Sequence, residues 1–343
     1  MKKLLNTLYV TSPDAYLSLD GENIVVRMDS VEAGRVPLHN LENIVTFGRQ
    51  GVSPALMHHA CGLGKGLAFF SAHGRFLCRV EGEERGNVLL RREQYRIADD
   101  ERRSLGIAVN MIGAKTSNAR AVLNRFLRDH PMSVDSAPIR SVSDGLKDSL
   151  SEIQNAPSAD ILRGLEGVNA SRYFSVFDAM ILQNKADFHF DSREKRPPCD
   201  PVNALLSFSY SIFANECASA LQSVGLDPFV GFMHTDRPGR RSLALDLMEE
   251  FRSVVCDRFV LSLINLRQIK ASDFTVKENG AVLLSDDARK SFLTAWQERK
   301  RETVLHPFLG EKCSWGILPF VQAQLLARHI RGDLDAYPPY LWR

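Results

Sequence analysis

Short apolar runs separated by turn residues characterise about the first ninety residues of the chain. Runs of this length, rich in β-branched and aromatic residues, are typical of strands. Asp20-Gly21 lies between two of them and favours a tight hairpin turn, while Ser53-Pro54 favours the start of one brief helix. The expected strands cover residues 16–19, 24–28, 35–38, 43–47, 67–70 and 76–80. This pattern predicts a small β-sandwich-like domain over residues 1–92.

From about residue 93 the apolar positions recur at helical spacing instead. Asn279-Gly280 is the one strong hairpin signal in this part of the sequence. Helices are expected over residues 99–128, 161–177, 202–221, 243–257, 286–305 and 315–331, with a polar, partly helical connection over 131–160. We therefore predict an α+β protein, in which the small N-terminal β-sandwich-like domain precedes a larger all-α domain over residues 93–343. The aromatic tail 336–343 contains two prolines, and its docking on this domain or on a partner stays open.

The segment 225–257 carries the densest polar pattern. Ser242 suits the N-cap of one long helix whose buried stripe includes Leu243 and Leu247. Asp246, Glu249 and Glu250 fall within one turn of that helix and repel one another. A metal ion could offset the repulsion, because histidine and carboxylates form a common ligand set and a histidine lies nearby. A solvated acidic face near the helix N-terminus is the equally plain alternative.

A second acid lies on an apolar stripe. In the helix expected over 161–177, Glu166 shares one side with Ala170, Tyr173 and Phe177. A carboxylate is costly to bury unless it is paired, protonated or metal-bound. The simpler interpretation is a surface glutamate at the edge of a core helix.

Positive charge is concentrated locally. Arg237, Arg240 and Arg241 form a basic loop just before the acidic helix. The helix expected over 99–128 also carries six basic residues, namely Arg102, Arg103, Lys115, Arg120, Arg125 and Arg128. Such residues can follow a DNA backbone, since phosphate contacts need positive charge rather than base-specific geometry. A solvated helix face is the alternative.

Composition excludes several classes of protein but does not identify a function. The net charge of the 343 residues is only +2, so any nucleic-acid surface must be local. The six cysteines are scattered, which disfavours a zinc ribbon or disulfide framework and favours a reducing compartment. No apolar run is long enough for a signal peptide or a membrane span. We expect a soluble, cytoplasmic protein without a membrane partner.

Three segments together resemble a known family, the CRISPR-associated endonuclease and integrase Cas1, and most closely its subtype I-C form. They are LEGVNASRYF around Glu166, RPPCDPVNALLSFSYSI from Arg196, and GLDPFVGFMHTDRPGRRSLALDLMEEFR from Gly225. The resemblance implies that the larger domain is catalytic. It also implies a homodimer that binds DNA together with the small partner Cas2, and whether Cas4 joins this complex stays open. The implied reaction inserts spacer DNA into the CRISPR array by attack of a 3′-hydroxyl on a repeat phosphodiester.

The resemblance also implies the site residues. Glu166, His234 and Glu249 match the three catalytic metal ligands of the family, with Mn²⁺ or Mg²⁺ as the cofactor. Many relatives have aspartate where Glu249 stands, so the longer side chain shifts the expected geometry. Asp246 is then expected beside the metal ligands or near DNA, and Glu250 on the helix surface or in a salt bridge. The loop residues Arg237, Arg240 and Arg241 are candidates for DNA contacts.

Two other functions remain to be distinguished. A non-catalytic DNA-binding scaffold protein would explain the basic helices and would show no activity with any divalent metal. A metallohydrolase of small substrates would have a closed pocket and no affinity for branched DNA. The resemblance favours the metal-dependent DNA endonuclease and integrase.

Overall fold

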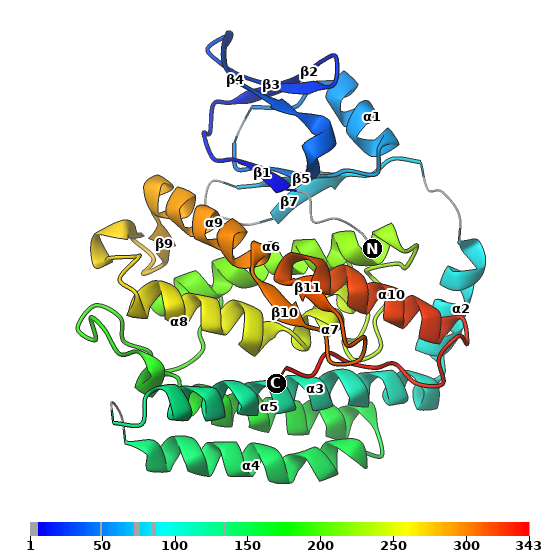
Figure 1. The fold of residues 1–343 in the computed structure, drawn as a ribbon, viewed down its shortest axis with the longest axis vertical. Coiled ribbons are helices and arrows are strands. Elements are labelled where there is room, and N and C mark those ends of the chain that lie inside the picture. The colour runs from blue at the N-terminus through cyan, green and yellow to red at the C-terminus, as the bar shows by residue number, and fades with distance from the viewer. Residues whose placement is uncertain (1–5, 49, 72–75, 84–86, 133–134, 343) are drawn as a thin grey trace.

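The computed structural model describes residues 6–48, 50–71, 76–83, 87–132 and 135–342. A strand-rich N-terminal region lies at one end of the molecule, and the remainder is mainly helical (Figure 1). The α+β class and this order of regions are therefore confirmed. The division expected at residues 92/93 falls inside a helix, Val88–Asp99 (α2), and stays a prediction.

Two sheets form the N-terminal region. One has the order β1-β5-β6-β7 and mixes parallel with antiparallel pairs, and the other is the antiparallel meander β2-β3-β4. Apolar residues of both sheets and of α1 share one core, including Leu17, Ile24, Ile44 and Leu56. The bounds are β1 Asn6–Val10, β2 Tyr16–Asp20, β3 Asn23–Met28, β4 Val31–Pro37, β5 Leu41–Thr46, α1 Pro54–Gly62, β6 Gly66–Phe70 and β7 Phe76–Val80.

The β1-β5-β6-β7 sheet also packs against the helices. Phe47 lies 6.1 Å from Phe208 of α6 between ring centroids, and Phe208 meets Phe292 of α9 edge-on at 4.8 Å. The N-terminal region therefore shares part of the main hydrophobic core with the helical region.

The helical region consists of nine α-helices within the described residues. Their bounds are α2 Val88–Asp99, α3 Glu101–Asp129, α4 Ser136–Gln154, α5 Ala159–Ser175, α6 Pro201–Ser223, α7 Ser242–Glu249, α8 Arg258–Asn265, α9 Asp286–Arg301 and α10 Leu318–Ile330. Helices α3, α4 and α5 lie together at the end opposite the sheets (Figure 1). The structure shows no helix in the described part of the chain that is long and apolar enough to cross a membrane.

Three details of the helical region differ from the prediction. The region is not all-α, because it contains two short antiparallel pairs, β8 Phe274–Val276 with β9 Val282–Leu284, and β10 Thr303–Leu305 with β11 Lys312–Ser314. The polar connection over 131–160 is largely the helix α4, whose buried side includes two serines that weaken the apolar signal, Ser143 and Ser149. The helix expected to run on from Leu243 is broken, because α7 ends at Glu249 and a π-helical segment, Arg252–Asp257, precedes α8.

The aromatic tail docks on its own chain. Asn118 of α3 donates hydrogen bonds to the backbone oxygens of Glu250 and Tyr340 (2.7 and 2.8 Å) and accepts one from the backbone N–H of Trp342 (2.8 Å). Tyr337, Tyr340 and Trp342 are all buried. The tail is thereby fastened to α3 and to the residue that follows α7.

Candidate functional site

The three acids around the end of α7 point in three different directions. Asp246 contacts the loop before the helix, Glu249 contacts α3, and Glu250 contacts the C-terminal tail. Such divergence follows from helix geometry, which separates Asp246 from Glu249 by about 60° and Glu249 from Glu250 by about 100°. All three are buried, so the solvated acidic face is excluded.

Asp246 holds the loop that carries His234. One of its oxygens accepts from the backbone N–H groups of Phe232 and Met233, at 2.7 and 3.0 Å. The other accepts from the backbone N–H of His234 at 3.0 Å, and lies 2.6 Å from Nδ1 of the same residue. In a neutral imidazole, this contact places the proton on Nδ1 and the lone pair on Nε2.

This arrangement needs a glycine at position 231. A Cβ added there would lie 2.6 Å from Oδ2 of Asp246 and 2.9 Å from atoms of Ser242. The loop is also fastened from two other helices. Ser104 of α3 donates to the backbone oxygen of Phe232 (2.9 Å), and Arg163 of α5 donates to that of Met233 (3.1 Å).

Glu249 lies between two cations. Its Oε2 is 2.7 Å from Nζ of Lys115, and Nη1 of Arg252 donates to both of its oxygens at 2.8 and 3.1 Å. Burial by itself raises the pKa of this carboxyl, but Arg252, Lys115 and His234 together lower the pKa of Glu249 to about 2. Glu249 is therefore ionised at every physiological pH.

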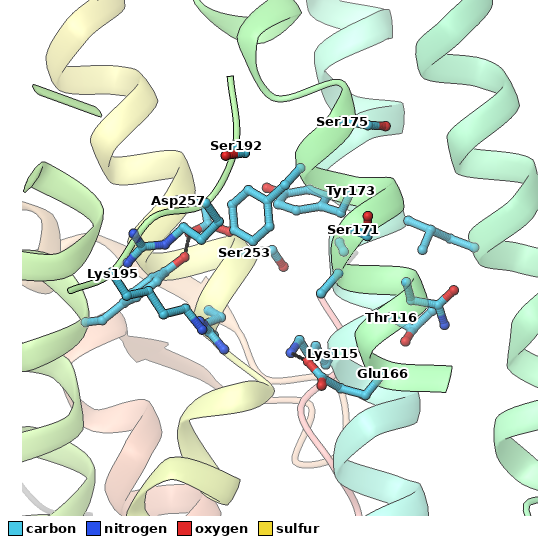
Figure 2. Close-up of a pocket in the computed structure, with 18 of the residues that line it drawn as sticks. Lys115, Thr116, Glu166, Ser171, Tyr173, Ser175, Ser192, Lys195, Ser253 and Asp257 are labelled. Atoms are coloured by element: carbon cyan, nitrogen blue, oxygen red, sulfur yellow. Dashed lines mark hydrogen bonds and ion pairs between the residues drawn. The ribbon is translucent and has the colours of Figure 1, made fainter. Parts of the chain in front are cut away.

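Glu166 of α5 shares Lys115 with Glu249. Its Oε1 accepts a hydrogen bond from Nζ of Lys115, and the side chains point at each other in Figure 2. Glu166 is half-buried and is paired with Lys115 rather than solvated alone at the edge of its helix. Two helices and the end of a third thus bring two carboxylates to one ammonium group.

A pocket of about 380 Å³ opens beside this ion pair (Figure 2). Tyr173, Phe174 and Tyr210 supply aromatic walls, and Arg193, Lys195 and Arg252 supply positive charge. Burial, followed by the nearby Arg252 and Arg193, lowers the pKa of Lys195. Such a lining suits an anionic ligand with planar groups.

Glu166 and Glu249, two of the three expected metal ligands, are brought together with Lys115 between them. Within the described ranges, no three His, Cys, Asp or Glu side chains are grouped closely enough to hold a metal. The two carboxylates nevertheless already converge on one cation, and His234 is near enough to help lower the pKa of Glu249. Two carboxylates and an imidazole with a free Nε2 lone pair fit Mn²⁺, whereas Mg²⁺ prefers oxygen ligands.

The three loop arginines do not form one surface. Arg237 is exposed and Arg240 is half-buried. Arg241 instead lies over the ring of Phe76 in β7, at 3.8 Å from its centroid, and donates to Asn215 at 3.3 Å. Burial, with Arg79 nearby, lowers the pKa of Arg241 to about 10. Arg241 therefore joins the two regions of the molecule.

Two corrections concern residues next to the site. Glu250 is fully buried rather than on the helix surface, because the C-terminal tail covers it. Lys115 is neither solvated nor free for DNA, since only 14% of its side chain is exposed. The sequence itself marks Lys115 as an unusual lysine. It falls on the apolar stripe of α3, four residues after Met111 and four before Ala119, where an unpaired lysine would be costly.

Comparison with known proteins identifies close relatives. The sequence model of the family described as "CRISPR associated protein Cas1" matches residues 8–298. "CRISPR-associated endonuclease Cas1 1" of Chlorobaculum tepidum is 50% identical over 343 residues, and "CRISPR-associated endonuclease Cas1 2" of Rhodospirillum rubrum is 52% identical over 348 residues. Both matches cover 100% of each chain. A "CRISPR-associated exonuclease Cas4/endonuclease Cas1 fusion" of Geobacter sulfurreducens is 36% identical, and the match covers 98% of this chain and 60% of the fusion.

Solved structures with the same fold are more distant in sequence. A casposase bound to its integration product has a TM-score of 0.83 at 22% identity, with 97% of this chain and 93% of that chain covered. A chain of a Cas6-RT-Cas1–Cas2 complex has a TM-score of 0.82 at 22% identity, with 99% of this chain and 36% of that chain covered. These two similarities concern the fold.

Proposed function

The chain belongs to the Cas1 family of CRISPR-associated endonucleases, and we propose that it is a divalent-metal-dependent DNA endonuclease and integrase of CRISPR adaptation. It inserts spacer DNA into the CRISPR array when a 3′-hydroxyl attacks a repeat phosphodiester. With water in place of the 3′-hydroxyl, the same site cleaves DNA.

The convergence of Glu166 and Glu249 on one cation is the observation that supports this proposal most strongly. A protein that only binds DNA has no need to bring two carboxylates together, because they repel each other and the phosphate. A catalytic site for phosphodiesters does need them. The scaffold protein is therefore the less favoured alternative.

Glu166, Glu249 and Nε2 of His234 are the groups that would hold the ion. A bound Mn²⁺ or Mg²⁺ would supply Lewis acidity, which lowers the pKa of the attacking hydroxyl and stabilises the charge that develops on the phosphate oxygens. Asp246 keeps the proton of His234 on Nδ1, so Nε2 stays available. Arg252 fixes both oxygens of Glu249 and keeps them ionised.

No side chain of this chain has to act as a nucleophile. The incoming 3′-hydroxyl forms the new phosphorus–oxygen bond, and the 3′-oxygen of the cleaved repeat strand leaves with a proton. Lys195 lines the pocket beside the carboxylates and is the candidate for binding the phosphates of a DNA end, whereas Arg193 is held by Asn203 and Ser207. The reaction therefore depends on placement and charge rather than on a covalent enzyme intermediate.

We propose the finer features of the assembly on the same basis. The three matching segments favour subtype I-C. The family implies a homodimer that binds the spacer precursor and the CRISPR repeat together with Cas2, in the cytoplasm. A Cas4 partner is supported by the relatives in which Cas4 and Cas1 are fused in one chain.

A reconstituted integration assay tests the proposed function. The protein, Cas2 and a duplex with free 3′-hydroxyls are incubated with a repeat-bearing plasmid, with Mn²⁺ or with EDTA. We expect covalent joining of the duplex to the plasmid only with the metal. DNA binding without joining under both conditions would indicate the scaffold protein instead.

A further inference from the structure

Lys115 occupies an unusual position for a lysine. It lies on the buried stripe of α3, and its ammonium group contacts Glu166 on one side and Glu249 on the other. Glu249 has a second cation in Arg252, whereas Lys115 is the one cation whose ion pair with Glu166 the structure records among the described residues. Lys115 is therefore the group that joins the two carboxylates.

The ammonium group of Lys115 offsets the repulsion between the carboxylates of Glu166 and Glu249. Without the ammonium group, two carboxylates from different helices would face each other, and one of them is buried. Removing one partner of a buried ion pair leaves an uncompensated charge and is strongly destabilising. Lys115 therefore holds α5 and the end of α7 at the separation that two carboxylates around one cation require.

The proposed metal ion needs the position that Nζ of Lys115 occupies. A divalent ion bound by Glu166 and Glu249 would have to lie between their oxygens, where Nζ of Lys115 now lies. An ammonium group and a divalent cation repel each other and cannot share that space. Metal binding must therefore include displacement of the lysine.

We propose that Lys115 is an internal counter-cation that keeps the catalytic carboxylates in place in the metal-free protein and is displaced when the divalent ion binds. Lys115 is thus a positioning residue, and it lowers metal affinity because its two ion pairs must break. The released ammonium group stays beside the pocket, next to the position expected for the DNA phosphate. This inference rests on the proposed function, because it uses the same metal site.

Metal-binding measurements on variants test the inference directly. We would titrate Mn²⁺ by calorimetry into the wild type, Lys115→Met and Glu249→Gln, with Lys147→Met on the exposed side of α4 as the matched control. Lys115→Met should bind Mn²⁺ more tightly by about tenfold or more, as expected when a close charge pair no longer competes. Lys147→Met should match the wild type, and Glu249→Gln should bind weakly. Equal or weaker binding by Lys115→Met would overturn the inference.

A second measurement uses the wild type alone, so it does not depend on how the variant folds. Amine acetylation at Lys115, followed by mass spectrometry, should increase when Mn²⁺ is added, because the displaced ammonium group loses both partners. Lys147 should react equally with and without the metal. Unchanged or reduced labelling of Lys115 at saturating Mn²⁺ would contradict displacement.

The outcomes separate this inference from the proposed function. If the wild type binds Mn²⁺ through Glu249 and Lys115→Met binds it with the same affinity, the metal site is supported and the counter-cation role of Lys115 is wrong. If neither the wild type nor Lys115→Met binds Mn²⁺, both the metal site and the inference are wrong.

Discussion

Asp257 is a buried acid whose ionisation should be visible in the stability of the protein. Tyr210 donates to it at 2.5 Å, yet burial outweighs that bond and the nearby Arg252 and Arg193, and raises the pKa of Asp257 to about 6 from 3.8. The folded state therefore favours the neutral carboxyl. As the pH rises from about 4 to about 6, the unfolded chain loses the proton first, so stability falls.

We predict that Asp257→Asn removes this part of the pH dependence. Relative to the variant, the wild type should lose up to roughly 3 kcal/mol of unfolding free energy between pH 4 and pH 7. Urea unfolding at several pH values measures the difference, with the exposed Asp148→Asn as the control. Parallel profiles for the wild type and Asp257→Asn would show that Asp257 keeps an ordinary pKa.

The loop arginines give a second prediction at this scale. Arg237 is exposed and Arg240 half-buried, so these two stay candidates for DNA contacts, whereas Arg241 packs on Phe76. Replacing Arg237 and Arg240 with alanine should weaken DNA binding and reduce the salt slope by about two, because two fewer counterions are released. Arg241→Ala should lower thermal stability with little change in that slope. An unchanged slope in the double variant would remove both arginines from the interface.

At the scale of elements, the C-terminal tail supports the end of α7. The two oxygens of Glu250 accept hydrogen bonds from Tyr337 (2.5 Å), from the backbone N–H of Tyr340 (2.7 Å) and from Gln322 of α10 (2.9 Å). Burial still raises the pKa of Glu250 to about 8, although these three donors lower it. The residue directly after Glu249 is therefore held by the tail in a nearly neutral form.

We predict that Glu250→Ala destabilises the protein by about 3 kcal/mol, since it leaves the buried hydroxyl of Tyr337 and the backbone N–H of Tyr340 without this acceptor. Glu250→Gln should cost much less, because it resembles the neutral acid in shape and hydrogen bonding. Thermal and urea unfolding of the two variants test this difference. Similar stability of Glu250→Ala and the wild type would show that the tail does not depend on Glu250.

The sequence predicted elements better than their ends and contacts. The strand runs, the helix from Asp200-Pro201 and the hairpin at Asn279-Gly280 follow from local pattern and turn chemistry, and all are present. The break between α7 and α8 does not follow from local pattern. At this break, Glu249 and Glu250 pair with distant segments, α3 and the C-terminal tail, and local pattern reveals neither contact. The joining of Glu166, Lys115 and Glu249 was missed for the same reason, because the three residues come from three separate segments.

At the scale of the whole molecule, the N-terminal region offers a surface for pairing. β4 lies at the edge of its sheet, and within the described residues it pairs only with β3. Val31 on this strand is 69% exposed. An exposed edge with apolar residues is a route to symmetric strand pairing between two copies.

We therefore predict a homodimer. Light scattering should give about twice the chain mass of 38.4 kDa at micromolar concentration. Val31→Lys places a charge on this exposed edge and should weaken the dimer, whereas a loop substitution such as Asp236→Asn should not. A stable monomer of the wild type would rule out this assembly.

The most direct test of the metal site compares neighbouring carboxylates in the strand-transfer reaction. Glu249→Gln keeps the size of the side chain but loses the charge that faces Lys115, so it should abolish Mn²⁺-dependent joining while DNA binding is retained. Glu250→Gln, the same substitution one residue further on, should keep most of the activity, and Asp246→Asn should reduce it less completely than Glu249→Gln. Full activity of Glu249→Gln, with loss in Asp246→Asn, would contradict the account and identify Asp246 as the ligand.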